Sequence, residues 1–89
     1  MTIKKGFVIK EIAGQHVVVA LGEASKVFNG IIKLNYSGKL IWEMIAEGKT
    51  RDQIVDAMLE LYSDVDRQTV ENDFDKFVAT LEGANIIEQ

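Results

Sequence analysis

The side chains that most often carry out catalysis are sparse in this sequence. It contains no cysteine, which excludes a disulfide framework and a thiolate metal site. The single His16 has no second ligand residue nearby, so we expect a surface or half-buried imidazole. The sequence also lacks a glycine-rich phosphate loop, a nucleophile elbow and a metal-binding histidine pair. We therefore predict that the chain is not an enzyme and uses no cofactor.

Carboxylates are the one chemically active group present in quantity. Asp64, Asp66, Glu71 and Asp73 are close enough in sequence to suggest a calcium site, but they lack the glycine turn and terminal glutamate of a calcium-binding loop. Helix capping explains Asp66 more simply. The other acidic residues lie on the polar faces of predicted helices, where solvation accounts for them, so we predict no metal site.

Charge is distributed unevenly along the chain. Residues 1–35 contain five lysines and two acidic residues, whereas residues 36–89 contain five basic and twelve acidic residues. Affinity for nucleic acids comes largely from cationic side chains that displace counterions from phosphates. The acidic half therefore counts against a nucleic-acid partner.

Length and composition indicate a single folded unit. The 89 residues, of which 47% are hydrophobic and 27% charged, match an ordinary globular domain, and we expect one domain over residues 1–89. Neither a signal peptide nor a stretch long enough to cross a membrane is found in the sequence. We predict a cytoplasmic protein with no membrane partner.

The first third of the chain has the pattern of strands. Residues 7–12 and 16–21 are rich in β-branched side chains and are joined by Ala13-Gly14-Gln15, which predicts a hairpin. A looser connection is expected over residues 22–30. Residues 31–34 then form a short third strand, whose alternation places Ile32 and Leu34 on one face and Ile31 and Lys33 on the other. One face can join the core while the other stays available.

The rest of the chain has the pattern of three helices. Asn35 is a cap for the first helix and Gly48 ends it. Thr50 and Gln53 have the spacing of a capping box at the start of the second helix, and Asp66 caps the third. 

Each predicted helix has an apolar face. These faces are Leu40, Ile41, Met44 and Ile45 in the first helix, Ile54, Val55, Met58, Leu61 and Tyr62 in the second, and Val70, Phe74, Phe77, Val78 and Leu81 in the third, before Gly83. Ile86-Ile87 ends the chain as a short extended tail. Because the connections are short, the helices must fold back on one another. The predicted fold is α+β and winged helix-turn-helix-like, with three N-terminal strands followed by a three-helix bundle.

The segment Leu34–Gly48, LNYSGKLIWEMIAEG, resembles the PqqD family, named for coenzyme PQQ synthesis protein D. It is similar to the family's pattern of Leu-Asn, a small residue with Gly, Ile-Trp-Glu and an acidic residue with Gly. Residues 49–62 are similar to the family's second helix, which begins at a threonine and ends at a tyrosine. The final helix and tail match at Val70, Asp73, Phe74, Phe77, Leu81, Ile86 and Ile87. The resemblance covers roughly residues 28–89 and rests on many positions.

The resemblance implies a function and a fold. Members of the PqqD family bind the leader segment of a ribosomally made precursor peptide and present it to a maturase, often a radical-SAM enzyme. The implied fold is a winged helix-turn-helix, in which the leader adds as a strand beside the third strand, in a groove bounded by the third helix. The expected partners are a precursor peptide and a maturase, and no nucleic acid.

This arrangement implies a set of peptide-binding residues. On the third strand they are Gly30, Ile31, Ile32, Lys33 and Leu34, and on the third helix they are Asp73, Lys76, Phe77 and Thr80. Lys33 suits an acidic leader. On a helical projection Phe74 and Leu81 lie in the middle of the apolar stripe and are expected in the core, whereas Phe77 lies at its edge. The three polar helix residues either border the groove or form a solvated face.

Other interpretations stay open. Trp42 lies off the apolar stripe of the first helix and either packs beneath the hairpin, which we favour, or contacts a partner protein. A winged-helix transcriptional regulator is the alternative function, although its recognition helix would carry Arg67 and Lys76 among four acidic residues. A docking module for a larger enzyme and a homodimer formed through the open strand edge are further possibilities.

Overall fold

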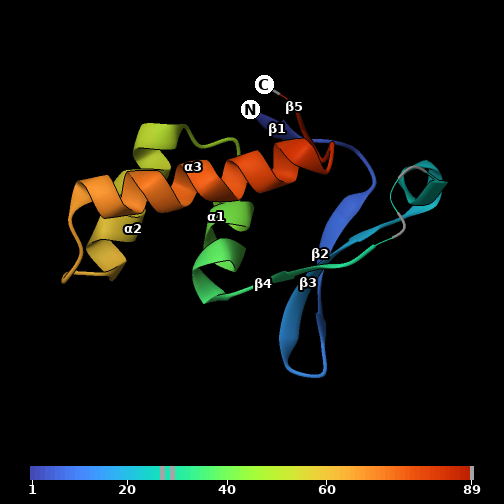
Figure 1. Cartoon of the computed structure of the whole chain (residues 1–89), viewed down its shortest axis with the longest axis horizontal. Helices are drawn as coiled ribbons and strands as arrows, with labels where there is room; N and C mark the ends of the chain where they lie inside the picture. Colours follow the sequence, from blue (N-terminus) through green and yellow to red (C-terminus); the bar gives the residue numbers. More distant parts are fainter. Residues whose placement is uncertain (27, 29, 89) are drawn as a thin grey trace.

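Strands occupy the N-terminal part of the chain and helices most of the rest (Figure 1). The computed structural model describes residues 1–26, 28 and 30–88. Its elements are β1 (Thr2–Ile3), β2 (Phe7–Ile12), β3 (Gln15–Ala20), the 3-10 helix η1 (Gly22–Lys26), β4 (Ile32–Leu34), α1 (Tyr36–Ala46), α2 (Arg51–Leu61), α3 (Arg67–Gly83) and β5 (Ile87–Glu88). The predicted α+β class, with N-terminal strands followed by three helices, is confirmed.

The three predicted strands form one antiparallel sheet in the order β2-β3-β4. The hairpin between β2 and β3 turns through Ala13 and Gly14, which both have positive φ, at 51° and 79°. Such a two-residue loop matches the right-handed twist of its strands. Gln15 belongs to β3 rather than to the turn, and β4 begins at Ile32, one residue later than expected.

The sheet has two unlike faces. Val18 is fully buried, and its cross-strand neighbours Ile9 and Ile32 pack against the same core. Because side chains alternate along a strand, Lys33 lies on the opposite face, as predicted. Leu34 returns to the core side. The third strand thus joins the core with one face and leaves the other exposed.

A second, two-stranded sheet was not predicted. β1 pairs antiparallel with β5, with Ile3 opposite Ile87, and the Lys4 amide donates to the Ile86 carbonyl at 2.8 Å. The two ends of the described chain therefore lie side by side (Figure 1). The expected loose connection over residues 22–30 is wrong at its start, where η1 forms; Val27 and Asn29 lie outside the described residues.

All three predicted helix caps are confirmed. The Gly38 amide donates to Asn35 Oδ1 at 2.7 Å and the Thr69 amide to Asp66 Oδ1 at 2.8 Å. The capping box is complete, because the Gln53 amide donates to the Thr50 hydroxyl at 3.1 Å and the Thr50 amide to Gln53 Oε1 at 2.9 Å. Side-chain caps satisfy amides that the first helical turn leaves unpaired.

The core lies where the three helices and the inner face of the sheet meet. Trp42 is buried in it, which confirms the burial that was predicted, whereas its packing beneath the hairpin stays a prediction. α1 contacts β1, β4 and α2, so its buried surface is wider than one helical stripe. The predicted burial of Leu61 and Tyr62 is wrong: they are 59% and 36% exposed. α2 ends at Leu61, and Tyr62 leaves the helical conformation, which places both on the surface.

Candidate functional site

The outer edge of β4 carries backbone groups that β3 does not use. The Leu21 amide donates to the Gly6 carbonyl at 2.7 Å, which marks a hydrogen-bonded pair in the β2–β3 ladder. Such pairs alternate in an antiparallel ladder, so odd residues of β3 bond to β2 and even ones to β4. The partners of the even residues on β4 are Ile32 and Leu34. Lys33 therefore directs its N–H and C=O to the open edge.

A groove adjoins this edge, between β4 and α3. Its first hollow, of about 220 Å³, is bordered by Ile32, Lys33, Leu34, Asn35, Gly38, Phe77 and Thr80. A second hollow, of about 250 Å³, continues along α3 and is bordered by Asn35, Ser37, Gly38, Ile41, Asp73, Lys76 and Phe77. We call the two together the β4–α3 groove. The shared residues, Asn35, Gly38 and Phe77, make the hollows continuous.

Seven of the nine residues expected at the site border this groove. Phe77 is half-buried and lies in both hollows, while Asp73, Lys76 and Thr80 are exposed along the same side of α3. The structure thus brings the predicted strand residues and helix residues together. Gly30 and Ile31 precede β4 and border neither hollow.

The start of α1 forms the floor of the groove, and it was missed in the residue prediction. Gly38 is buried there, and a Cβ atom at this position would lie 3.1 Å from Asn35 Oδ1 and 3.4 Å from Cε1 of Phe77. The contact with Asn35 Oδ1 is shorter than most Cβ contacts, whereas the contact with the ring is close to an ordinary van der Waals distance, so glycine relieves crowding chiefly at the helix cap. A glycine in the first turn of a helix, where propensity disfavours it, is the sequence signal that indicates this contact.

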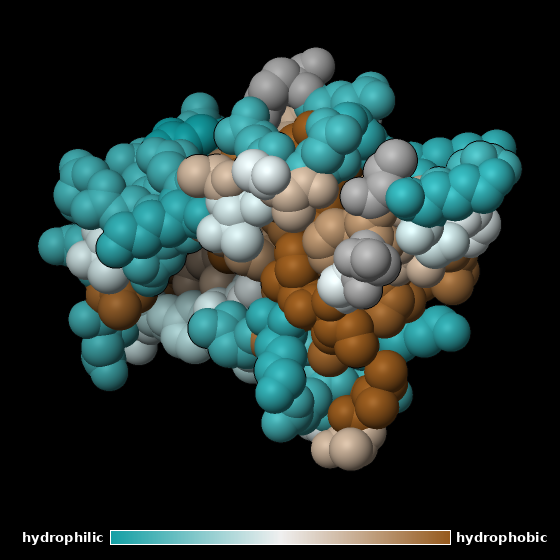
Figure 2. Space-filling view, turned by 45° about the vertical axis from the view of Figure 1, so that its right-hand side comes forward, coloured by the Kyte–Doolittle hydropathy of each residue, from teal (hydrophilic) through white to brown (hydrophobic). Residues whose placement is uncertain are grey.

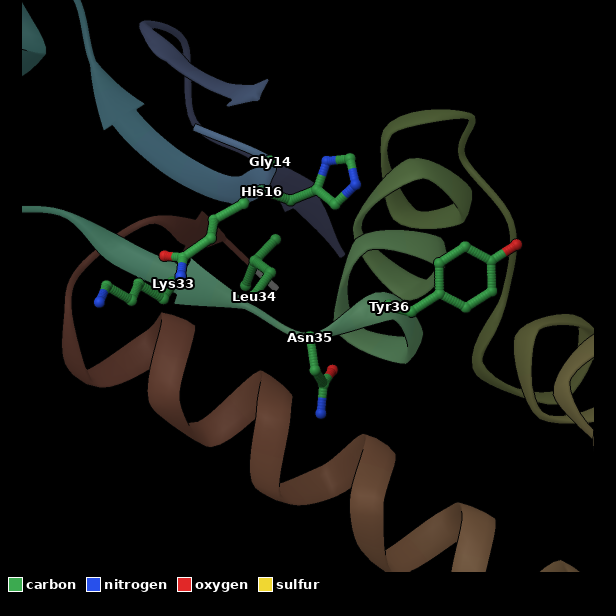
Figure 3. A pocket seen from close by; sticks show the side chains of 7 residues that line it. Gly14, His16, Lys33, Leu34, Asn35 and Tyr36 are labelled. Carbon is green, nitrogen blue, oxygen red and sulfur yellow. The ribbon is translucent and has the colours of Figure 1, made fainter. Parts of the chain in front are cut away.

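A larger hollow, of about 470 Å³, lies at the hairpin end of the same edge. It is bordered by Gly14, Gln15, His16, Lys33, Leu34, Asn35 and Tyr36. In Figure 3, Lys33 and Tyr36 point to opposite sides of this hollow, and Asn35 points towards α3. His16 is half-buried, as expected, and contributes its ring from β3. This hollow is open to solvent. It extends the accessible edge of β4 beyond the groove.

Among the described residues, Ile31 is one of three exposed large apolar residues in the strand-forming part of the chain. It is 61% exposed, and Ile12 and Leu21 are exposed to 50% and 46%. Figure 2 shows apolar side chains in a band that descends over the sheet towards the hairpin, with hydrophilic residues around it. An extended chain placed beside β4 would therefore meet an apolar residue, Ile31, next to the cationic Lys33.

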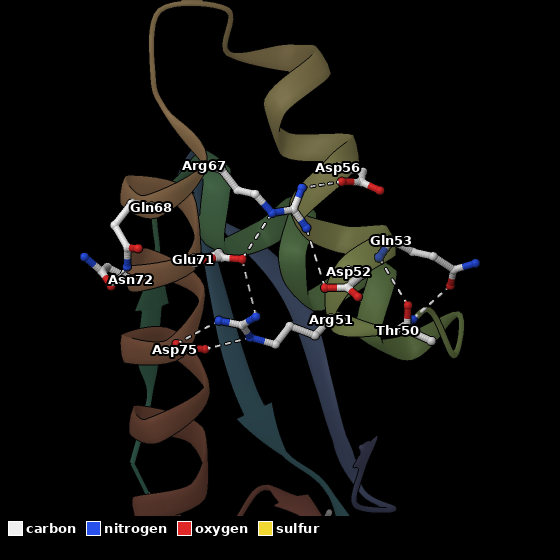
Figure 4. A network of polar contacts seen from close by, with 10 residues as sticks. All are labelled: Thr50, Arg51, Asp52, Gln53, Asp56, Arg67, Gln68, Glu71, Asn72 and Asp75. Carbon is white, nitrogen blue, oxygen red and sulfur yellow. Dashed lines mark hydrogen bonds and ion pairs between the residues drawn. The ribbon is translucent and has the colours of Figure 1, made fainter.

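Two arginines form ion pairs with carboxylates on the acidic surface of α2 and α3 (Figure 4). Arg67 contacts Asp56 at 2.7 Å, Glu71 at 3.2 Å and Asp52 at 3.5 Å, which joins α3 to α2. Arg51 donates two hydrogen bonds to Asp75, at 3.1 and 3.0 Å. 

These contacts shift the titration of the groups involved. The hydrogen bonds from Arg51 lower the pKa of Asp75, and the same contact raises the pKa of Arg51. The hydrogen bond to Asp56 raises the pKa of Arg67. Arg67, one of the two cations that a DNA-reading α3 would offer, is thus occupied by carboxylates of its own chain.

Within residues 1–26, 28 and 30–88, no three histidine or carboxylate side chains lie together in a way that would hold a metal ion. Among the helices of the described chain, none is both long and apolar enough to cross a membrane.

Comparison with known proteins decides the family. The model of the family described as "Coenzyme PQQ synthesis protein D (PqqD)" matches residues 15–87. The chain belongs to the PqqD family. The matched segment of this PqqD-family chain runs from the start of β3 into β5, so it includes every residue that borders the groove.

A solved structure is similar over nearly the whole length of this PqqD-family chain. It is described as "TbiB1 in Complex with the TbiA(beta) Leader Peptide" and is 32% identical in sequence. The superposition has a TM-score of 0.80 and covers 99% of this chain and 95% of the other. No curated protein sequence matches significantly. The similarity includes the N-terminal strands, which lie outside residues 28–89, where the sequence resemblance was found.

Proposed function

We propose that this chain captures the leader segment of a ribosomally made precursor peptide as an added strand beside β4. The observation that carries the proposal is the open edge at Lys33 next to the β4–α3 groove. An added strand gains affinity from main-chain hydrogen bonds and specificity from pockets for alternate side chains. TbiB1, a structural relative at 32% identity, is solved with a leader peptide.

The two sides of the added strand would meet different surroundings. Side chains directed inwards enter the groove, where Leu34 and the half-buried Phe77 offer apolar contacts. Side chains directed outwards lie beside Ile31 and the amine of Lys33. Lys76 adds a second positive charge at the groove. The preferred peptide therefore alternates apolar residues with acidic or apolar ones.

The binding is proposed to serve delivery rather than catalysis. A chain that holds one segment of a precursor by its backbone leaves the remainder of the precursor extended towards an enzyme. This role requires a maturase as a partner. The family resemblance implies a maturase of the radical-SAM type. Precursor synthesis and modification of this kind belong to the cytoplasm. The residues proposed to contact the peptide are Ile32, Lys33, Leu34, Asp73, Lys76, Phe77 and Thr80 at the groove, with Gly30 and Ile31 on the strand edge that precedes it.

Two substitutions at Lys33 test strand addition. Lys33→Pro removes the outward N–H without touching the bonds of Ile32 and Leu34 to β3, and proline is tolerated on sheet edges at such positions. Lys33→Ala removes the charge but keeps the N–H. Titration of ¹⁵N-labelled chain with the TbiA(beta) leader peptide should shift residues 30–35 and one flank of α3. Lys33→Pro should weaken binding about tenfold or more, and Lys33→Ala less.

The outcome distinguishes the groove from other surfaces. Spectral dispersion like that of the parent chain shows that each variant is folded. Equal affinity of Lys33→Pro and the parent chain, or shifts confined to residues outside β4 and α3, would exclude strand addition at this edge.

A further inference from the structure

An apolar pocket opens from the far end of the β4–α3 groove. It has a volume of about 190 Å³ and is bordered by Ser37, Ile41, Met58, Tyr62, Val65, Thr69, Val70 and Asp73. Its floor is core: Ile41, Met58 and Val70 are 5%, 4% and 8% exposed. Its rim includes Tyr62 and Val65, which are 36% and 39% exposed. The pocket therefore combines a buried apolar floor with an accessible apolar rim.

Local folding explains only part of this arrangement. Val65 precedes the Asp66 cap and stands five residues before Val70, the positions of a hydrophobic staple at the start of a helix. The staple accounts for contact between those two side chains. It does not account for the empty volume beside them or for Tyr62 at the opposite rim. Leu61, more exposed still, does not border the pocket and is the ordinary surface residue for comparison.

The pocket is continuous with the groove. Ser37, Ile41 and Asp73 border both the pocket and the second hollow of the groove. A chain that leaves the β4 edge along α3 thus passes the start of α1 and arrives at the pocket mouth. Continuity with the groove identifies the occupant as a further part of the same bound peptide.

The volume of the pocket and the charges around it indicate that it accepts a single uncharged side chain. A volume of about 190 Å³ is smaller than the roughly 300–1,000 Å³ of pockets for small-molecule ligands. It is larger than the roughly 150 Å³ of an apolar cavity that admits benzene. The charged group at its border is Asp73, and Asp64 and Asp66 lie in the adjoining turn, so an acidic residue would be repelled. 

We propose that this pocket binds a single branched aliphatic or aromatic side chain of the precursor peptide, outside the segment that pairs with β4. The inference rests on the proposed function, since the peptide must first occupy the groove. The peptide then carries two separate determinants: a strand segment recognised mainly through its backbone and an apolar anchor recognised by its side chain. Acidic residues belong near Lys33 and Lys76, and the anchor belongs at the opposite end.

Two substitutions at one exposed position test the pocket. Thr69→Tyr fills the pocket from its α3 border, whereas Thr69→Ala loses the hydroxyl and leaves the pocket open. The full TbiA(beta) leader peptide should bind Thr69→Tyr about tenfold more weakly than Thr69→Ala. A peptide shortened to the segment that protects the β4 amides should bind both variants equally. In the parent chain, the full peptide should shift the methyl signals of Met58 and Val65 but not those of Leu61.

Each failure has its own signature. Equal binding of the full peptide to both Thr69 variants, with β4 still shifted, would overturn the pocket and leave strand addition standing. If neither the TbiA(beta) leader nor any member of a displayed random-peptide library shifts β4, the proposed function fails and the pocket proposal with it. A glycine scan of the bound peptide should find one apolar residue whose loss abolishes the Met58 shift while the β4 shifts persist.

Discussion

At the scale of single residues, substitutions at two helical glycines distinguish the effect of helix propensity from the effect of close packing. Gly38→Ala and Gly83→Ala each replace a helical glycine, a change that gains up to about 1 kcal/mol of intrinsic propensity in a helix interior and less in a terminal turn. At Gly83 an added Cβ meets nothing within 4 Å, whereas at Gly38 it crowds Asn35 and Phe77. Gly83→Ala should therefore raise the unfolding temperature, by a few degrees. Gly38→Ala should give no gain, because the methyl group crowds the Asn35 cap, and should weaken peptide binding several-fold by shifting the groove floor against Phe77.

Thermal unfolding and peptide titration on both variants measure these effects. A Gly38→Ala variant that is as stabilised as Gly83→Ala and binds peptide normally would show that the groove floor tolerates a methyl group, contrary to the close contact.

The Asp66 cap predicts a pH dependence with a definite sign. The hydrogen bond from the Thr69 amide lowers the pKa of Asp66, so the folded state prefers the ionised carboxylate. A lowered pKa contributes stability at pH values above the unfolded value of 3.8, and this contribution is lost as pH falls through the folded value. Asp66→Asn retains an acceptor for the cap but cannot titrate. Urea unfolding should therefore show the parent chain losing more stability than Asp66→Asn between pH 6 and pH 3.

The contribution of Asp75 to stability has the same pH dependence, because Arg51 lowers the pKa of Asp75. Asp75 is present in both the parent chain and Asp66→Asn, so its contribution is common to the two pH profiles. Parallel pH profiles for the parent chain and Asp66→Asn would contradict the capping explanation.

At the scale of elements, the sequence predicted what local rules determine. Asn35, Thr50 with Gln53, and Asp66 mark helix starts because their side chains reach amides within three residues. The hairpin and β4 follow from runs of β-branched residues. The facing of β4 and α3 was inferred from the family resemblance rather than from spacing, and seven of the nine predicted residues border one groove.

The elements that were missed depend on contacts distant in sequence. β1 and β5 are two residues each and carry no periodicity, and their pairing joins the two ends of the chain. Burial of Leu61 was predicted from helical spacing alone, which cannot reveal that Leu61 lies on the uncovered side of the last turn of α2. The floor residues Ser37 and Gly38 and the apolar pocket arise from three helices meeting, a relation that no single segment contains.

The small β1–β5 sheet should contribute strongly to stability despite its size. Ile86, between α3 and β5, is fully buried, and its carbonyl accepts from Lys4. Ile86→Ala should lower the free energy of unfolding by about 2–5 kcal/mol, the usual cost of such a core truncation. Glu88→Ala, in β5 and exposed, should change it by less than about 0.5 kcal/mol. Urea unfolding monitored by Trp42 fluorescence compares the two; similar small effects would mean that the two chain ends are not part of the cooperative core.

At the scale of the whole molecule, charge changes along the length of the β4–α3 groove. The five lysines of residues 1–35 belong to the strands and their connections, and the excess of acidic residues belongs to the helices. Arg51 and Arg67 hold part of the acidic surface between α2 and α3. The β4–α3 groove runs from the lysine-bearing edge towards the acidic turn between α2 and α3. A peptide that is acidic at one end and apolar at the other matches this groove in one direction only.

That direction can be predicted from the sheet. β2, β3 and β4 are antiparallel throughout, and antiparallel pairing is the commoner and slightly more stable form, so the added strand should run antiparallel to β4. β4 leads from Ile32 into α1, towards the apolar pocket. An antiparallel peptide therefore places its N-terminal part at the pocket and its C-terminal part near Ile31. A nitroxide at the peptide's N-terminus should broaden the amide of Thr69, and one at its C-terminus the amide of Ile31. The reverse pattern would require a parallel strand, with the anchor following the strand segment instead of preceding it.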